Sequence, residues 1–482
     1  MVGHQAGPAV SGAVTRGKDN VAISPILKNR DFDLYWSGVV LSQIGSRGTL
    51  AANLYQVYAL SGSLAQTGLV GAAQAIALLV LSPLAGAYAD RLDRRRLLQC
   101  SQGLAMVVSA ALSVLSLTGA ITTWEVLVSV VLTTAAATFD QPARNALIPA
   151  LVPQRQLPQA FALLNPSREL AVLTGPALSG LLIAASGPGL MYVVDAATYA
   201  ILIIDLALIR IGDLPGAPRD ESVWHQIAEG FVFMRRRRIV WMMMSLDLSA
   251  TLFSSYRVVL PALALHRLHI GATGYGLLAS TPSLGALLAT YVVFRLVGRG
   301  RRLGHVLLTS TVAYGLSAIL LARAGDVPLV VTALLLLGAC DAMATTIRQA
   351  AVQLETPHEL RGRISAIYQM ASKGGPALGD TLMGSAAGAL GPGVAHMLGG
   401  VLTIAYVGAF LGRDNPVRRY AGAAAPVAQP ELAANQERQP LDTYAAPRAP
   451  SRGLPRRGGN GGGTPPYSGG HRVGRPPGEI QR

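Results

Sequence analysis

The sequence predicts an all-α integral membrane protein of about twelve helices, arranged as two six-helix halves related by a parallel repeat. Three observations predict this class. Of the 482 residues, 51% are hydrophobic and 13% are charged, whereas roughly a quarter are charged in a soluble domain. The hydrophobic residues form runs of about 20 or more, the length that crosses a bilayer. Short motifs of the first half return in the second half at a nearly constant distance.

The apolar runs divide the chain into spans and connecting segments. Short separators rich in Ser, Gly and Pro occur at 61–63 and 186–189, and a longer linker divides the spans six and six. The spans are expected near 33–60, 67–89, 97–119, 123–148, 157–185, 189–211, 239–265, 273–297, 303–324, 327–352, 363–390 and 392–412. We therefore expect an N-terminal bundle over 31–211, a cytoplasmic linker over 212–238 and a C-terminal bundle over 239–412.

Both ends of the chain differ from the apolar part. Residues 1–30 are polar and contain no long apolar core, so we expect a disordered cytoplasmic N-terminus without a cleavable signal peptide. Residues 413–482 are rich in Pro, Gly, Ala and Arg and have too few apolar residues to form a core. We expect this basic tail to be disordered and cytoplasmic, without a function of its own. Contact of its arginines with the membrane surface is the alternative.

The distribution of charge predicts the orientation. Lys and Arg number 40 against 25 Asp and Glu, a net charge of +15. Arginines cluster in the loops on one side of the predicted spans, as at 91–96 and 235–238, whereas the opposite loops hold little beyond Arg267 and Arg323. The positive-inside rule places the first set of loops and both termini in the cytoplasm of a cell-membrane protein. Because the charge follows loops and not one groove, it argues against a nucleic-acid partner.

The two halves share motifs in the same order. The corresponding segments are 66–69 and 272–275, with Thr-Gly in each; 175–178 and 375–378, both GPAL; and Arg144 and Arg348. The distances between them stay between 200 and 206 residues. Two six-helix halves of this kind are typical of transporters in which a central site lies between halves that rock.

The loop between the second and third predicted spans has a recognisable pattern. Its sequence, GAYADRLDRRRLL at 86–98, has a glycine, an aspartate four positions later and then an arginine cluster. It resembles the loop signature of the major facilitator superfamily, with Asp93 where that family usually has glycine. Aspartate also tolerates turn geometry. An ordinary basic loop that obeys the positive-inside rule is the alternative.

The resemblance implies the twelve-helix major facilitator fold and a latch role for this loop. In that role, Asp90 accepts hydrogen bonds at the start of the eleventh helix, near 361–363, and joins the two halves in the outward-open state. Gly86 lets the helices approach closely, and Arg94 or Arg95 braces Asp90. The residues assigned to the latch are Gly86, Asp90, Arg91, Arg94 and Arg95.

A second pattern lies in the fifth predicted span. Gly175, Pro176 and Gly180 are expected to bend this helix and to allow tight packing. The pattern resembles the Gly-Pro motif of exporters of the same superfamily, and a plain packing kink is the alternative. Further segments resemble the branch that contains the enterobactin exporter and macrolide- and multidrug-efflux proteins. These segments are DFDLYW at 31–36, FDQPAR at 139–144 with LIP at 147–149, and GFVFMR at 230–235.

Charged side chains within the spans are candidates for a transport pathway, because each costs about 2.5–3.5 kcal/mol at the middle of a membrane helix. The candidates are Arg47, Asp140, Arg144, Arg168, Glu169, Asp205, Asp247, Lys373 and Asp380. Asp140 and Arg144 are four residues apart and can pair on one helix face, which also suits a structural role. Those expected to line the central pathway are Arg47, Glu169, Asp247, Lys373 and Asp380. One of the carboxylates is expected to bind a proton from outside and release it inside as the substrate leaves.

These features predict a secondary active transporter that uses the proton gradient to export a small, partly apolar molecule, such as a drug, an antibiotic or a siderophore. A symporter of the same fold, working as an importer, is the alternative. A membrane-embedded enzyme is less well supported, because the sequence has no His-Glu-x-x-His, Gly-x-Ser-x-Gly or Gly-x-x-x-x-Gly-Lys-Ser/Thr motif. We expect no cofactor and no metal. The expected partners are the lipid bilayer and a small-molecule substrate, with the protein a monomer.

Overall fold

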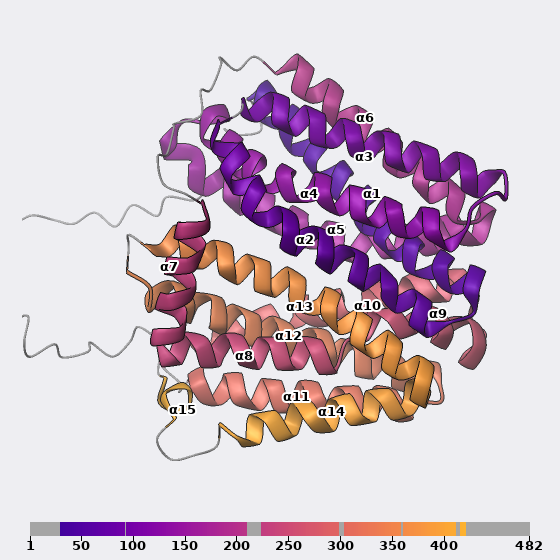
Figure 1. Ribbon diagram of the computed structural model, residues 1–482, viewed down its shortest axis with the longest axis vertical. Helices are drawn as coiled ribbons and strands as arrows, with labels where there is room; N and C mark the ends of the chain where they lie inside the picture. The colour runs from indigo at the N-terminus through magenta and orange to yellow at the C-terminus, as the bar shows by residue number, and fades with distance from the viewer. Residues whose placement is uncertain are drawn as a thin grey trace, which may run out of the picture. The chain divides into compact units, whose positions relative to one another are not determined.

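The computed structural model describes residues 29–91, 93–209, 223–297, 303–357, 360–410 and 415–420. This part of the chain is built from helices and contains no strand (Figure 1). The predictions for residues 1–28, for the start of the linker and for residues 421–482 of the basic tail lie outside the described residues. Residues 415–420, at the start of the segment expected to be disordered, contain a short helix that packs on the bundle, with Val417 fully buried.

The first half contains six long helices. They are α1 (Arg30–Ser61), α2 (Leu64–Arg91), α3 (Arg94–Leu117), α4 (Thr123–Leu151), α5 (Leu157–Ser186) and α6 (Pro188–Leu208), with the short 3₁₀ helix η2 (Gln154–Gln156) before α5. Local chemistry explains where they begin and end. The side chain of Asn29 caps the start of α1, and Gly62 ends that helix with φ of 62°. Gly187 ends α5 with φ of 79°, and Pro188 then begins α6 at a position that needs no N–H donor.

The second half begins with a short amphipathic helix and then repeats the pattern. Its helices are α7 (Val223–Arg236), α8 (Arg238–Phe253), α9 (Leu260–Ala262), α10 (Gly271–Val297), α11 (Leu303–Arg323), α12 (Val327–Leu354), α13 (Arg361–Leu390), α14 (Pro392–Gly408) and α15 (Pro416–Arg419). The 3₁₀ helix η3 (Arg257–Val259) and the π-helix η4 (Leu263–Arg267) flank α9.

The span predicted over 239–265 corresponds to the apolar segment Arg238–Arg267, which is long enough to cross a membrane but is not one continuous α-helix. The helix α8 ends at Phe253, and the chain continues through η3, α9 and η4. Pro261 lies in the first turn of α9, where its missing N–H is tolerated. The interruption places Ser255 and Arg257 on non-α-helical backbone beside the centre of the protein, in the way that broken helices line cavities in transporters.

The helices α1–α6 and α8–α14 form two bundles that contact each other through matching helices. In Figure 1, the indigo-to-magenta helices of the first half lie on one side and the pink-to-orange helices of the second half on the other. Between the bundles, α2 packs along α13 and α5 packs along α10. Within them, α1 packs on α5 and α6, and α12 packs on α10 and α11.

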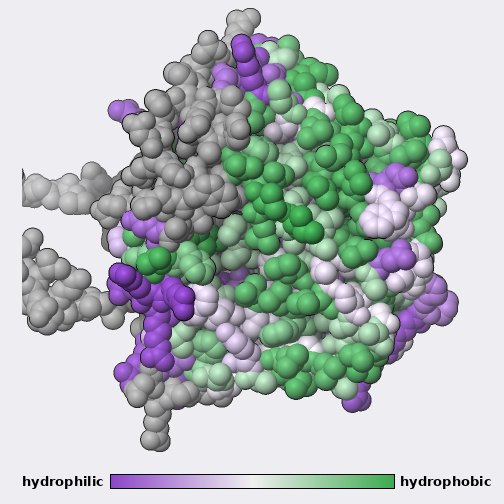
Figure 2. Space-filling view, in the orientation of Figure 1, coloured by the Kyte–Doolittle hydropathy of each residue, from purple (hydrophilic) through white to green (hydrophobic). Residues whose placement is uncertain are grey.

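The outer surface of the bundles is apolar, as a membrane environment requires. Ile76 and Leu288 are 62% and 68% exposed, and Figure 2 shows a broad apolar band on the face it presents. In the described part of the chain, eight helices are long and apolar enough to cross a membrane. The helices α1 and α13 are not among these eight, because polar and charged residues such as Arg47 and Lys373 interrupt them. The all-α membrane fold is therefore confirmed.

Candidate functional site

Two connected chambers lie between the bundles. The larger has a volume of about 490 Å³ and the smaller about 250 Å³. They share four lining residues, Arg47 and Leu50 of α1, Arg257 of η3 and Pro376 of α13. Since side chains of both halves line each chamber, the pair forms one central site at the interface of the repeat.

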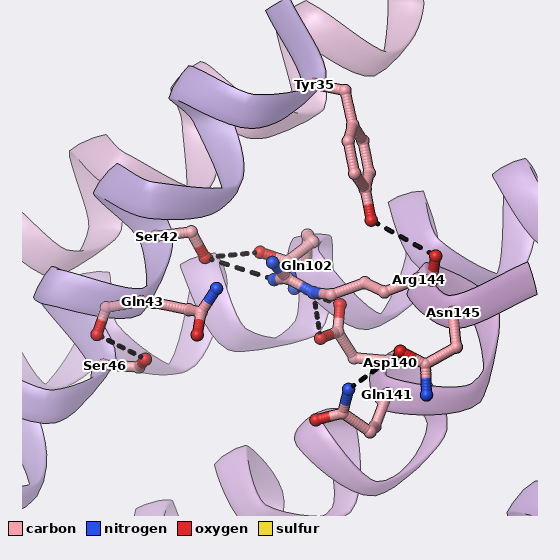
Figure 3. A network of polar contacts seen from close by, with 9 residues as sticks. All are labelled: Tyr35, Ser42, Gln43, Ser46, Gln102, Asp140, Gln141, Arg144 and Asn145. Carbon is pink, nitrogen blue, oxygen red and sulfur yellow. Dashed lines mark hydrogen bonds and ion pairs between the residues drawn. The ribbon is translucent and has the colours of Figure 1, made fainter. Parts of the chain in front are cut away.

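The larger chamber is polar, and a hydrogen-bonded network forms one of its walls (Figure 3). Asp140 and Arg144 of α4 form the ion pair expected from their spacing. Gln102 of α3 donates to Asp140 Oδ1 over 2.6 Å, and Ser42 Oγ of α1 donates to Gln102 Oε1 over 3.1 Å. The hydroxyl of Tyr35 donates to the carbonyl oxygen of Arg144 over 3.2 Å. The network joins α1, α3 and α4, so it holds this wall of the chamber in place.

The remaining charged residues of the larger chamber are cationic. Arg47 of α1, Arg168 of α5 and Lys373 of α13 all line it, and the side chains of Arg47 and Lys373 are exposed to its interior. Sequence reasoning expected Arg47 and Lys373 in this place. Glu169, which follows Arg168 on α5, is exposed and is not part of the lining of either chamber.

The smaller chamber is lined mainly by apolar and aromatic side chains. Tyr256, Tyr275 and Tyr314 form part of the wall, and Asp341 of α12 also faces this space. The hydroxyl of Tyr275 donates to the carbonyl oxygen of Ala51 over 2.8 Å, which fixes the ring between the two halves. This chamber can therefore accept an apolar group beside a few polar atoms.

An ion pair lies at the edge of both chambers. A nitrogen of Arg257 lies 2.6 Å from Asp380 Oδ2, and Ser255 Oγ donates to the other oxygen of the same carboxylate. Asp380 is 2% exposed and lies behind the lining, whereas Arg257 faces the cavity. Asp380 thus reaches the pathway through Arg257.

A second buried ion pair lies in the second half. Arg348 of α12 lies 2.6 Å from Asp247 of α8, and Arg348 is 2% exposed. Neither residue is part of the lining of the chambers. Asp205 of α6 is also buried away from them, against Gly38 of α1. The placement of Asp247 and Asp205 suits helix packing.

The predicted latch lies partly outside the described residues. Gly86, Asp90 and Arg91 belong to the last turns of α2, but their side chains are not described, and the same holds for 361–363. Arg95 donates to the carbonyl oxygen of Ala207 over 2.9 Å. Arg94, in the first turn of α3, is half-buried. Asp93 caps α3, because its side chain accepts from the N–H of Arg96 over 2.7 Å. This cap explains why aspartate suits the turn between α2 and α3.

The predicted kink residues form close contacts between helices. A Cβ atom on Gly175 would lie 2.9 Å from the backbone nitrogen of Gly48 in α1. A Cβ atom on Gly180 would lie 2.7 Å from the Cα atom of Gly276 in α10. The carbonyl oxygen of Pro176 also lies at this contact, next to Gly276. Glycine is needed at these positions because the backbones touch.

A second glycine contact joins the two halves on the same side of the chambers as the contact between Gly180 and Gly276. We call the end that holds Gly62, Gly187 and Gly391 the loop end, and the end where α1 begins and α6 finishes the terminus end. Near the loop end, a Cβ atom on Gly68 of α2 would lie 3.0 Å from the Cα atom of Gly384 in α13. A separate cavity of about 520 Å³ at the loop end shares no lining residue with the central chambers. The two halves are therefore in backbone contact between the chambers and the loop end.

Sequence reasoning missed several charged residues of the central region. Asp341 and Arg257 face the chambers, Arg348 completes the second ion pair, and Asp195 of α6 is fully buried and accepts from Ser109 Oγ over 2.8 Å. The signal that selected the other candidates was present here too, because all four lie inside predicted spans. Their roles as partners depend on helix rotation, which the spacing of residues along one helix does not reveal.

Comparisons with known proteins agree with this architecture. The sequence matches the family described as transmembrane secretion effector over residues 21–440. It is 28% identical to the enterobactin exporter EntS of Salmonella choleraesuis over 320 residues, which are 66% of this chain and 75% of the exporter. It is also 28% identical to the multidrug efflux pump Tap of Mycolicibacterium fortuitum over 359 residues, 72% of this chain and 87% of the pump.

Solved structures show a similar fold. The crystal structure of the nucleoside transporter NupG aligns with a TM-score of 0.62 and 17% identity, covering 80% of this chain and 100% of NupG. A bacterial homologue of the iron transporter ferroportin in its inward-facing state aligns with a TM-score of 0.61 and 16% identity, covering 78% of this chain and 98% of the homologue. At these identities the likeness concerns the fold alone.

Proposed function

The chain belongs to the transmembrane secretion effector family of major facilitator transporters, and we propose that it exports a small, partly apolar molecule across the cell membrane by alternating access. Its family and its relatives are transporters, so the chain is a transporter and not an enzyme. The names of two relatives, an enterobactin exporter and a multidrug efflux pump, support export over import.

The central observation behind the proposal is a pair of chambers between two repeated bundles, with a contact of helix backbones on one side. Gly180 against Gly276 and Gly68 against Gly384 hold the halves together near the loop end. Arg47 and Lys373 are nevertheless exposed inside the larger chamber. This combination supports a state in which the chambers open toward the terminus end.

The arginine-rich segments support a cytoplasmic terminus end. Arg94 and Arg95 begin α3 there, and the exposed arginines at 235–238 lie where α7 meets α8. With this orientation, the chambers receive cargo from the cytoplasm in the present state. Separation of the glycine contacts and closure of the terminus end would then release the cargo outside.

Asp380 is our candidate for proton coupling. When its carboxylate is charged, it holds Arg257 at the edge of the chambers. A proton that binds to Asp380 removes the negative charge and weakens the pair, so Arg257 can turn toward cargo or toward Asp341, which faces the same chamber. Release of that proton to the cytoplasm restores the pair. The cycle thus links one proton to a change in the charge of the binding site.

Transport by purified protein in inside-out vesicles tests this function. With an acidic lumen, export predicts uptake of at least one of three dyes (fluorescein, tetramethylrhodamine methyl ester or ethidium), together with proton release from the lumen. Asp380→Asn should abolish the dependence on the pH gradient. Glu125→Gln is the matched control, because Glu125 lies at the loop end, lines neither chamber and caps α4 in a way that glutamine preserves.

The direction of proton flow separates export from import. An exporter that exchanges cargo for protons moves dye and protons in opposite directions, whereas an importing symporter moves them in the same direction. Failure to move any of the dyes under either gradient would contradict the proposed function.

A further inference from the structure

Three cations face the larger chamber without an acidic partner. Arg47, Arg168 and Lys373 come from α1, α5 and α13, so the two halves both contribute. Within the described ranges, no carboxylate oxygen lies within 4.0 Å of their side-chain nitrogen atoms. We call these three residues the cation trio.

The other arginines that line the chambers are compensated. Arg144 pairs with Asp140, and Arg257 pairs with Asp380. Two further acids lie in the region, but neither forms an ion pair with the trio. Asp341 faces the smaller chamber on the side of Arg257, and Glu169 is exposed outside the lining. The larger chamber therefore keeps an excess of positive charge.

Such a group of cations is costly unless something neutralises it. Like charges repel more strongly where protein and lipid replace water, and uncompensated charges inside a membrane protein are unfavourable. Guanidinium and ammonium groups bind carboxylate, sulfonate, phosphate and phenolate oxygens through charge-assisted hydrogen bonds. An anion in the larger chamber would offset this excess of positive charge.

The adjoining smaller chamber has the opposite character. Tyr256, Tyr275 and Tyr314 line it, and the chain provides aliphatic side chains such as Leu54 and Leu260 between them. Arg47 belongs to the lining of both chambers. A molecule that reaches the trio with an acidic group can therefore extend an apolar or aromatic body into the smaller chamber.

We propose that the cargo is an amphiphilic organic anion, whose acidic group binds the cation trio and whose apolar body occupies the smaller chamber. This proposal rests on the proposed export function and names its substrate class. A soluble anion and an anionic lipid share this chemistry.

Two dyes with the same ring skeleton and opposite charge provide the test. Fluorescein is an anion, and tetramethylrhodamine methyl ester is a cation. Binding is measured on the full chain in phosphatidylcholine nanodiscs, with empty nanodiscs as the blank. We expect tighter binding of fluorescein. Arg47→Gln, Arg168→Gln and Lys373→Gln should each weaken it about tenfold, while Arg47→Lys, which keeps the charge, should weaken it less.

Arg155→Gln is the control for loss of charge as such, because Arg155 is exposed in η2 and lines neither chamber. Its affinity for fluorescein should equal that of the unchanged protein. Sulfate, which has charge but no apolar body, should displace fluorescein poorly. Nanodiscs with added phosphatidylglycerol distinguish the sources: unchanged affinity indicates a soluble anion, and competition indicates a lipid anion.

Several results would overturn the proposal. These are preferential binding of the cationic dye, no binding of fluorescein at millimolar concentration, equal weakening by Arg155→Gln, and displacement by sulfate as effective as by fluorescein itself. Vesicle transport keeps the two proposals apart. Gradient-driven export of the cationic dye without export of fluorescein would support the export function and contradict the proposal that the cargo is an anion.

Discussion

Asp380 pairs with Arg257 and at the same time lies at the contact between the two halves. A Cβ atom on Gly71 of α2 would lie 2.7 Å from the Cβ atom of Asp380. The carboxylate that holds Arg257 therefore sits on the helix surface that packs against the other bundle. A change in the charge of Asp380 can reach both the binding site and the contact that must separate during transport.

The contact of α2 with α13 leaves no room for a side chain at Gly71. We expect Gly71→Ala to separate the helices near the loop end and to favour the state that opens there, because the added Cβ meets backbone and not a flexible side chain. A cysteine introduced at Leu50, which lines both chambers, measures the opening by its reaction with a membrane-impermeant maleimide added at the loop end, in a chain with Cys100→Ser and Cys340→Ser.

Gly103→Ala is the matched control for this substitution. Gly103 lies in α3, and a Cβ atom there would have no neighbour within 4 Å. Labelling of the control should equal that of the cysteine-substituted parent. Equal labelling of the Gly71→Ala protein would show that the contact does not limit opening.

The buried pair of Asp247 and Arg348 should stabilise the second bundle only as a pair. Asp247→Ala leaves the charge of Arg348 buried without a partner, which costs about 3–5 kcal/mol of stability. Adding Arg348→Met removes that charge and should recover most of the loss, since an apolar side chain of similar size can fill the space. Thermal unfolding in detergent measures both proteins. A double variant as unstable as the single one would argue that Arg348 has further essential contacts.

The hydroxyl of Tyr192 lies within hydrogen-bond distance of two amide side chains in the first half. It lies 2.9 Å from Asn53 Oδ1 and 2.7 Å from Gln56 Oε1, and all three residues are buried. We expect Tyr192→Phe to destabilise the protein by about 1–3 kcal/mol, because it leaves buried polar atoms without this partner. Tyr406→Phe is the control, since Tyr406 stacks on Phe410 and its hydroxyl has no hydrogen bond within the described ranges. Comparable melting temperatures for both variants would contradict the expectation.

Hydropathy predicted most long helices well, because membrane spans must be both long and apolar. The expected spans 157–185 and 303–324 correspond to α5 (Leu157–Ser186) and α11 (Leu303–Arg323). The span expected over 239–265 also corresponds to an apolar segment, Arg238–Arg267, but hydropathy did not reveal that its α-helix stops at Phe253. Hydropathy measures the environment of a segment and does not report its backbone hydrogen bonds.

The central site could be predicted only in part for a related reason. A charge inside a span identified Arg47 and Lys373, which face the larger chamber, and the spacing of Asp140 and Arg144 identified their pairing on one helix. The partners of Asp247 and Asp380 come from other elements. Such partners depend on how helices rotate and approach one another. The spacing of residues along a single sequence does not specify this geometry.

A substitution at the predicted latch residue Asp90 should shift the conformational equilibrium in the direction opposite to Gly71→Ala. If Asp90 joins the halves at the terminus end in the outward-open state, Asp90→Asn should favour the present state and reduce labelling at residue 50 from the loop end. Asp93→Asn is the control three residues away, because asparagine can keep the cap that Asp93 provides for α3. Combining Asp90→Asn with Gly71→Ala should bring labelling back toward that of the parent, since the two changes shift one equilibrium in opposite directions. If the double variant labels like Gly71→Ala alone, the two ends of the protein open independently, and the latch has no part in alternating access.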